Sequence, residues 1–535
     1  MNTRASASTA SRNPALDWSA TLSPLQLESA ALLLICVTLS VGAFRCFPLY
    51  DDGWMAMALR ESGPRFLAQH LGDRPLFGFL LERLASFGPA NKLVFVILNA
   101  VLWLVFAIES HILFRELFPE LKDYAIVAAC LTLAPIVLQT QLSTADVVIP
   151  TNLATIFGYA SILVLLGRGH AGKPKRPLLL GIAAASAALG VALSEYGVDT
   201  NLVGCAILIG VALASSSREA RRRLFISAVW LFGLTVVAYL IFAKTADFSA
   251  RPDISPSQMA HRGEAKWLEV PFDVVAGAWH ALIGAYSAAL GAVTLAWDSK
   301  STLVGILCGL LMVVLLSLAI QSRRTRATPE DHPVRLAYRV AVLLPSVLVG
   351  LVPFRVMGRP TTLLEFGSRF RIPIMPVAAA ITLVLILSLV RPALRWIPVA
   401  VFGLLIGYAS WTFTYKAVQQ SRSIAALAAA LKPYVAHVSG YTVAIVPFNR
   451  FEIELTANIS STWPVDLEKR LWVVGEEPAR IEFGNRSTCR PGAALDIHVR
   501  GLTRAGKLDE LLWVEAPPGR PVSIEPYCLT QNDNH

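Results

Sequence analysis

Twenty residues in the second half of the chain, 302–321, read TLVGILCGLLMVVLLSLAIQ, and no charged side chain interrupts them. A helix needs about 20 predominantly apolar residues to cross the hydrocarbon core of a bilayer. Arg323, Arg324 and Arg326 follow almost at once and mark the point where the chain returns to water. The run therefore predicts one membrane-spanning helix with a basic exit.

The rest of the chain repeats this pattern. Of the 535 residues, 55% are hydrophobic and 16% are charged, whereas soluble domains average about 25% charged residues. Similar runs predict about eleven spans, at residues 25–45, 92–114, 124–141, 147–167, 177–194, 199–216, 223–243, 302–321, 335–353, 372–390 and 396–414. The expected fold class is mainly α, a polytopic helical membrane protein with additional amphipathic helices on its outer face.

Basic loops between the runs set the predicted orientation. The loops around residues 168–176, 218–223 and 323–335 are rich in Arg and Lys, which accumulate on the cytoplasmic side of membrane proteins. With these loops inside, the N-terminus is cytoplasmic, and the loop 46–91 and the C-terminal tail are periplasmic or extracellular. The stretch 272–297 must then stay on one side, so we expect an outer-face or re-entrant helix there. The predicted location is the inner (cytoplasmic) cell membrane.

Composition divides the chain into three parts. Residues 1–24 are rich in Ser, Ala and Thr and predict a disordered cytoplasmic leader. Residues 25–415 form the membrane domain, and residues 416–535 are more polar. In this tail a helix-like run, 423–438, precedes several strand-like runs, which predicts a small extracytoplasmic α/β domain. The strand candidates are residues 441–446, 471–474, 494–499 and 511–514.

The formal net charge of +10 does not indicate a nucleic-acid partner. The basic loops account for much of it, and the chain has no surface pattern of interleaved aromatic and basic residues. Its seven cysteines and nine histidines show no spacing typical of a metal site. Cys489 and Cys528 stand alone in the polar tail and are able to pair if that tail faces an oxidising compartment.

Acidic residues open the first outer loop, 46–91. Asp51 and Asp52 directly follow the first predicted span, and two predicted amphipathic surface helices, 55–67 and 76–84, come after them. One carboxylate is enough to cap a helix, while two adjacent ones repel each other, which raises the pKa of one or calls for a cation. The pair is therefore a helix cap, a general base, or a site for a divalent cation such as Mg²⁺ or Mn²⁺.

These features together resemble the GT-C superfamily, whose members are membrane-embedded glycosyltransferases that use polyprenyl-phosphate sugars. The first loop is similar to that of GtrII-like O-antigen glucosyltransferases and of arabinosyltransferases. Asp73-Arg74-Pro75-Leu76 looks like the family's Gly-Arg-Pro-Leu element, with Asp73 in place of Gly. The resemblance covers roughly residues 25–415 and leaves the tail out.

Two further motifs resemble the same family. The turn Ser194-Glu195 is similar to a Lys-Glu turn near the fifth span, with Ser194 in place of Lys. The segment 368–373, Ser-Arg-Phe-Arg-Ile-Pro, is similar to the Arg-Tyr-x-x-Pro signature that opens a late span. Both lie on the predicted outer face.

The resemblance implies an inverting transfer of a sugar from a polyprenyl-phosphate donor to a glycan, lipid or protein acceptor, with Asp51 or Asp52 as the base. Arg has forked donors that match phosphate. The loop 354–371 is unusually rich in Arg for an outer loop, which favours a role beyond the alternative of anchoring to lipid phosphates. We expect donor-phosphate contacts from Arg74, Arg355, Arg369 and Arg371, Arg369 above all. We expect substrate contacts from Asp73, Glu195 and Glu365.

Three other functions remain open. A transporter or flippase for lipid-linked sugars should place charges inside the spans along its path, whereas the acids here gather at one face. A membrane O-acyltransferase should have a buried catalytic His, and the spans offer little beyond His111. A non-catalytic partner in polysaccharide assembly is also compatible with the sequence.

Overall fold

The computed structural model describes most of the apolar runs and four short strands. The described residues are 23–46, 65, 74–86, 92–133, 149–170, 176–245, 269–284, 286, 299–323, 333–356, 371–412, 414–415, 442–447, 480–483, 493–500 and 513–514.

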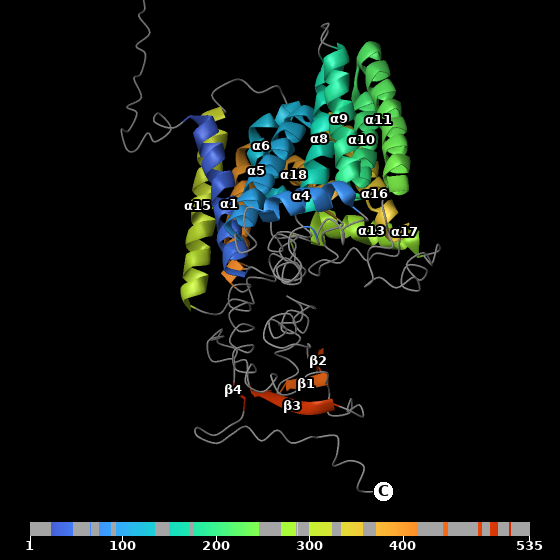
Figure 1. The fold of residues 1–535 in the computed structure, drawn as a ribbon. Coiled ribbons are helices and arrows are strands. Elements are labelled where there is room, and N and C mark those ends of the chain that lie inside the picture. Colours follow the sequence, from blue (N-terminus) through green and yellow to red (C-terminus); the bar gives the residue numbers. More distant parts are fainter. Residues whose placement is uncertain are drawn as a thin grey trace, which may run out of the picture.

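Long helices form a bundle in which most of them run roughly side by side (Figure 1). They are α1 (Pro24–Cys46), α5 (Lys92–Leu117), α8 (Ile149–His170), α9 (Arg176–Leu193), α10 (Tyr196–Ala214), α11 (Arg218–Thr245), α15 (Ser299–Arg323), α16 (Pro333–Val349) and α18 (Met375–Leu389). A further helical segment spans Pro392–Thr412. Side chains such as Val229 (71% exposed) and Leu240 (56% exposed) on α11 face outward, as expected for helices whose solvent is lipid.

Among the described residues, eight helices are long and apolar enough to cross a membrane. The multi-pass character is therefore confirmed, but the number of eleven spans is not. The apolar parts of α1 and α9 are shorter, Pro24–Thr38 and Pro177–Leu193. The helix α6 (Ala125–Thr132) covers only the first half of the predicted run 124–141, whose remainder lies outside the described residues.

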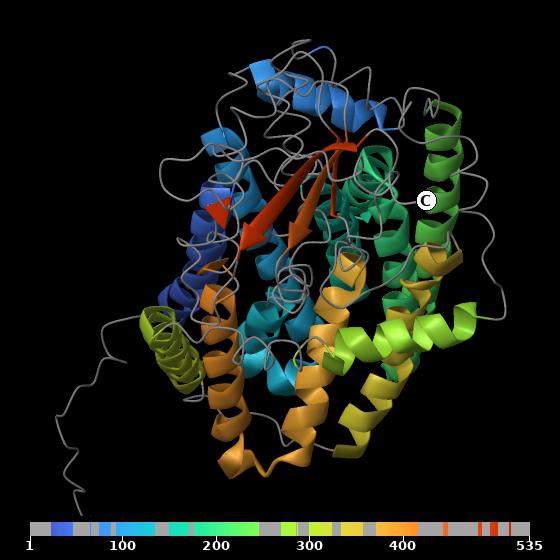
Figure 2. The same ribbon diagram turned by 90° about the horizontal axis from the view of Figure 1, so that it is seen from below.

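Two shorter helices lie across one end of the bundle. Figures 1 and 2 show α4 (Pro75–Ser86) and α13 (Val270–Trp279) lying flat against the helix ends. Phe77 of α4 is buried while Phe79 is half exposed, so α4 is amphipathic, as predicted for residues 76–84. The helix α13 continues into a single π-helical turn, His280–Gly284, and does not run along the bundle. Its outer-face location stays a prediction.

The two ends of the bundle differ in charge. We call one the basic end: there α5, α10 and α15 finish and α11 and α16 begin. Its described cations include Arg115, Lys122, Arg218, Arg221, Arg222, Arg223, Arg323, Arg335 and Arg339. The opposite end, here the α4 end, carries α4, the α9–α10 turn, α13, the short helix α17 (Val352–Val356) and the start of α18. The predicted outer residues that the structure describes belong to the α4 end.

Glycines allow close helix approaches in the described part of the bundle. A Cβ atom on Gly197 would lie 2.1 Å from the carbonyl carbon of Gly190, and one on Gly190 would lie 2.9 Å from the carbonyl oxygen of Ala154. Small residues let helix backbones pack this closely in membranes. The start of α10 is thereby held close to the end of α9, and the end of α9 close to the first turns of α8.

The described tail contains a four-stranded sheet of order β2-β1-β3-β4. The strands are β1 (Thr442–Pro447), β2 (Arg480–Phe483), β3 (Ala493–Arg500) and β4 (Trp513–Val514), with β1 parallel to β2 and β3, and β4 antiparallel to β3. Three of them overlap predicted strands, whereas β2 was not predicted. The predicted strand 471–474 and helix 423–438 lie outside the described residues, so the α/β domain stays a prediction.

Candidate functional site

The structure describes three of the nine predicted site residues in full. Asp51, Asp52, Asp73, Glu365 and Arg369 lie outside the described residues. Arg355 belongs to α17, but only its main chain is described. Arg74, Glu195 and Arg371 have defined side-chain contacts, and all three lie at the α4 end of the bundle.

Arg74 and Glu195 form a two-pronged ion pair. The Arg74 Nη2 atom donates to Glu195 Oε1 at 2.8 Å, and Arg74 Nε donates to Glu195 Oε2 at 3.2 Å. The side chains are only 14% and 22% exposed, so water screens the pair weakly. Paired in this way, Arg and carboxylate add geometric specificity to their attraction. The pair joins two segments separated by 121 positions in the sequence.

Local structure explains why both side chains are held in place. Pro75 starts α4, where its fixed backbone angle suits the first helical position, and the carbonyl of Arg74 accepts the Gly78 N–H at 2.8 Å. Glu195 occupies the tight turn between α9 and α10, and Ser194 Oγ donates to its Oε2 atom at 3.0 Å. Ser194 thus stands where the resemblance leads us to expect Lys, and Arg74 supplies the positive charge beside Glu195 instead.

Arg371 is fully buried at the turn that leads into α18. Its Nη1 atom donates to the carbonyl of His280, at 3.4 Å, in the π-helical turn that follows α13. Because this contact is to the main chain of the protein, it fixes α13 to the start of α18. The donor-phosphate role expected of Arg371 stays a prediction.

Further contacts connect the two arginines through the same end of the bundle. Tyr196, next to Glu195, packs against Phe354 of α17 with ring centroids 5.4 Å apart. Tyr159 of α8 donates its hydroxyl to the carbonyl of Pro373, two residues after Arg371, at 2.6 Å. These contacts hold the Glu195 turn against α17 and hold α8 against the segment that follows Arg371.

Buried polar side chains in the spans were not predicted as site residues. Within the described part of the chain, both amide atoms of Asn152 and the hydroxyl of Thr155, on α8, have no hydrogen-bond partner. The carboxylate of Glu109, on α5, is 8% exposed and its Oε2 atom has none either. Polar groups inside a span commonly mark a substrate path or a water-filled cavity. In the sequence these residues appear only as isolated polar residues within apolar runs, which do not indicate a site by themselves.

No metal site is apparent among the residues that the structure describes, where no three His, Cys, Asp or Glu side chains are close enough to hold an ion. Asp51 and Asp52, which were considered as ligands for Mg²⁺ or Mn²⁺, lie outside them. The free cysteines described, Cys36, Cys130, Cys205 and Cys308, are in the spans. Cys489 and Cys528 are not among the described residues.

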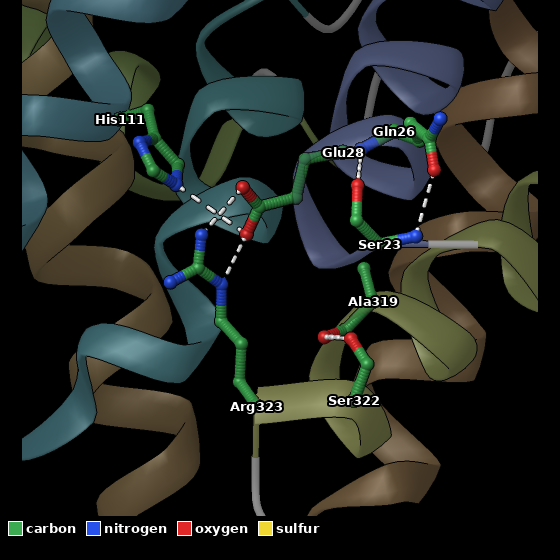
Figure 3. A network of polar contacts seen from close by, with 7 residues as sticks. All are labelled: Ser23, Gln26, Glu28, His111, Ala319, Ser322 and Arg323. Atoms are coloured by element: carbon green, nitrogen blue, oxygen red, sulfur yellow. Dashed lines mark hydrogen bonds and ion pairs between the residues drawn. The ribbon is translucent and has the colours of Figure 1, made fainter. Parts of the chain in front are cut away.

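A second polar network lies at the basic end and was also not predicted (Figure 3). Glu28 of α1 accepts two hydrogen bonds from Arg323 of α15, at 2.6 and 2.7 Å, and His111 Nε2 of α5 lies 3.7 Å from the same carboxylate. Ser23 and Gln26 form reciprocal hydrogen bonds at the start of α1. The network connects α1, α5 and α15, and because it lies far along α5 from the α4 end, we interpret it as structural.

Replacing Glu28 with Gln is expected to destabilise the protein by about 3 kcal/mol, because breaking a buried ion pair leaves a charge without its partner. Thermal unfolding of purified protein in detergent measures the effect. The control is Glu219→Gln, which breaks the Arg223 pair on exposed α11 surface and should change stability by less than about 1 kcal/mol. Equal unfolding temperatures for the two variants would contradict a structural role for the network.

Comparison with known proteins adds no support to the GT-C resemblance: no protein-family model matches the chain, and no curated protein matches it.

Proposed function

We propose that the chain is an integral membrane glycosyltransferase, which transfers a sugar with inversion from a polyprenyl-phosphate donor to a glycan, lipid or protein acceptor outside the cytoplasm. The Arg74–Glu195 pair supports this most directly. It anchors the chain immediately after Asp73, at the C-terminal side of the loop that contains Asp51 and Asp52. It thereby ties the proposed catalytic loop to the membrane domain.

The chemistry requires few groups. An acceptor hydroxyl attacks the anomeric carbon of the sugar, and a carboxylate takes the proton from that hydroxyl. The leaving group is a lipid phosphate, whose growing negative charge calls for fixed cations rather than a general acid. In this proposal Asp51 is the base, and Asp52 assists, binds substrate or holds a divalent cation.

The described contacts refine the expected roles of the arginines. Because Arg74 already holds Glu195, we assign it to positioning the first loop, with any contact to the donor phosphate secondary. Arg369, two residues before the buried Arg371, is the favoured ligand of the donor phosphate. Arg371 fixes the described segment that follows Arg369 in the sequence. Asp73 and Glu365 remain proposed substrate contacts.

The proposed orientation places the basic end in the cytoplasm, following the distribution of Arg and Lys. A reporter protein fused after Asp298 should then report the periplasmic or extracellular side, whereas one fused after Arg324 should report the cytoplasm. Paired enzymatic and fluorescent reporters, each active on one side only, measure this. A cytoplasmic signal at Asp298 would mean that the segment before it crosses the membrane.

A second candidate is a transporter or flippase for lipid-linked sugars, and one observation favours it. Glu109 is a carboxylate buried in the apolar helix α5, which is the kind of residue that transport paths contain. Glu195, paired with Arg74 at the α4 end, favours the transferase instead. A reaction at one membrane face needs no path for the substrate through the bilayer.

Reconstituted protein separates the two functions. Purified protein in liposomes is supplied with radiolabelled polyprenyl-phosphate sugars of several kinds and with glycan or lipid acceptors. The transferase should form labelled acceptor and release unlabelled polyprenyl phosphate. Repeating the assay with a chelator tests whether transfer needs a divalent cation. Movement of the intact labelled lipid between leaflets with no new glycosidic bond would support the flippase.

A further inference from the structure

A cavity of about 270 Å³ opens at the basic end of the bundle, at the opposite end from the Arg74–Glu195 pair. The end of α5, the α10–α11 turn and the first turns of α16 surround it. Its polar lining includes Glu116, Ser215, Ser216, Ser217, Arg335 and Arg339. The sequence analysis predicted none of these residues as a site residue.

The two arginines of the cavity are held by a shared carboxylate. Arg339 Nη1 contacts Glu120 Oε2 at 2.5 Å and the carbonyl of Leu117 at 3.2 Å. Arg335 Nε lies 3.6 Å from the other oxygen of Glu120, and its side chain is 56% exposed. One carboxylate shared between two guanidinium groups leaves an excess of positive charge, and Arg335 keeps most of its surface available for a ligand.

The opposite wall adds further positive character. The hydroxyl of Ser217 accepts the N–H of Ala220 and so caps the start of α11, whose first turns carry Arg218, Arg221 and Arg222. The positive end of the helix dipole points into this region. Arg221 Nη2 donates to the carbonyl of Ser215 at 2.9 Å, which holds the turn in shape. Glu116, Glu120 and Glu219 are the acidic groups of the described surroundings, and the cations outnumber them.

Exposed apolar side chains neighbour the lining residues in the sequence, and we call them the rim of the cavity. Val334, next to Arg335, is 81% exposed, and Leu213, next to the lining residue Ala214, is 45% exposed. Tyr338 is half exposed and donates its hydroxyl to the carbonyl of Leu213 at 3.3 Å. Tyr is typical of the boundary between headgroups and acyl chains. A ligand that fits both the lining and the rim has a negative head and a hydrocarbon body.

We propose that this cavity binds the phosphate headgroup of an anionic phospholipid from the leaflet at the basic end. Basic pockets between transmembrane helices bind anionic headgroups in this way. In the bound state Arg335 and the Ser215–Ser217 turn hold the phosphate, and the acyl chains lie along Val334 and Tyr338. A soluble anion would leave the apolar rim unused. The proposal does not depend on sugar transfer, so either can fail without the other.

Lipid-dependent stability tests the proposal on the full-length protein in detergent. Phosphatidylglycerol should raise the unfolding temperature of the wild type, and phosphatidylcholine with the same acyl chains should not. Arg335→Ala should weaken the apparent affinity for phosphatidylglycerol about tenfold, since it removes a charged hydrogen-bond donor. Ser216→Glu, a change on the exposed turn, should weaken it similarly by adding a negative charge beside the phosphate.

The matched control is Arg391→Ala, which removes the same charge from an exposed site at the turn after α18, outside the lining, and should leave the lipid response nearly unchanged. Equal losses for Arg335→Ala and Arg391→Ala would overturn the cavity as the site and indicate general attraction to a basic surface. Inorganic phosphate that protects as well as the lipid at equal concentration would overturn the lipid assignment. If Arg335→Ala and Ser216→Glu both kept full affinity for phosphatidylglycerol, the proposal would be overturned altogether.

Discussion

Asp51→Asn should reduce sugar transfer by about 10³-fold, because a positioned general base contributes about 10² to 10⁴ in rate and an amide cannot accept the proton. The loss should fall on kcat, with the donor KM little changed, since Asn keeps the shape of Asp. Initial rates with radiolabelled polyprenyl-phosphate sugar measure both constants. Raising the pH should not restore the variant, because no titratable group remains at that position.

Asp52→Asn distinguishes the roles within the pair. If Asp52 assists or binds substrate, its variant should lose less than Asp51→Asn and should raise KM. Glu82→Gln on α4 is the matched control, since it removes a carboxylate from the α4 end of the bundle that is not part of the proposed base pair. Normal transfer by both Asp variants, at wild-type levels of folded protein, would show that the base lies elsewhere.

Breaking the Arg74–Glu195 pair should lower transfer by about 10²-fold, because a displacement of about 1 Å in a catalytic group has an effect of that size. Glu195→Gln removes the charge and keeps the shape, and Arg74→Met removes the cation. Each single variant releases the same anchor, so the double variant should be hardly worse than either one. Rates of the four proteins form a double-mutant cycle, which measures the coupling.

The cycle also separates positioning from phosphate binding. If Arg74 contacted the donor phosphate independently of Glu195, the two losses would multiply in the double variant, and Arg74→Met would mainly raise the donor KM. Ser194→Ala serves as the control, since it removes the hydroxyl hydrogen bond to Glu195 and leaves the ion pair with Arg74 in place. An additive cycle would overturn the assignment of Arg74 as a positioning residue.

The sequence predicted the helices well because the bilayer leaves little choice. A run such as 302–321 has to satisfy all its backbone groups internally, so it forms a helix wherever it is placed in lipid, and α15 lies there. The amphipathic α4 was predicted from a different pattern, because its apolar residues recur at helical spacing. The number of spans was less predictable, because α1 and α9 are near the minimum length.

The partners of the charged residues were not predictable from the sequence. Arg74 and Glu195 are 121 positions apart, and Glu28 and Arg323 are 295 apart. Which acid meets which base depends on how the helices pack, and no local pattern carries that information. Ser194 illustrates the consequence: its local motif indicated a lost cation, while the packing supplies Arg74. The strand β2 was missed because Arg480–Phe483 contains two charged residues in four.

The backbone contact between Gly190 and Gly197 has a consequence for the evolution of this protein. Any side chain at Gly197 would collide with main-chain atoms, which cannot rotate away as a side chain does. Gly181 and Gly233, by contrast, have open space beside them. We therefore expect substitutions to be tolerated at Gly181 and Gly233 and to be selected against at Gly190 and Gly197, which preserves the turn that presents Glu195 to Arg74.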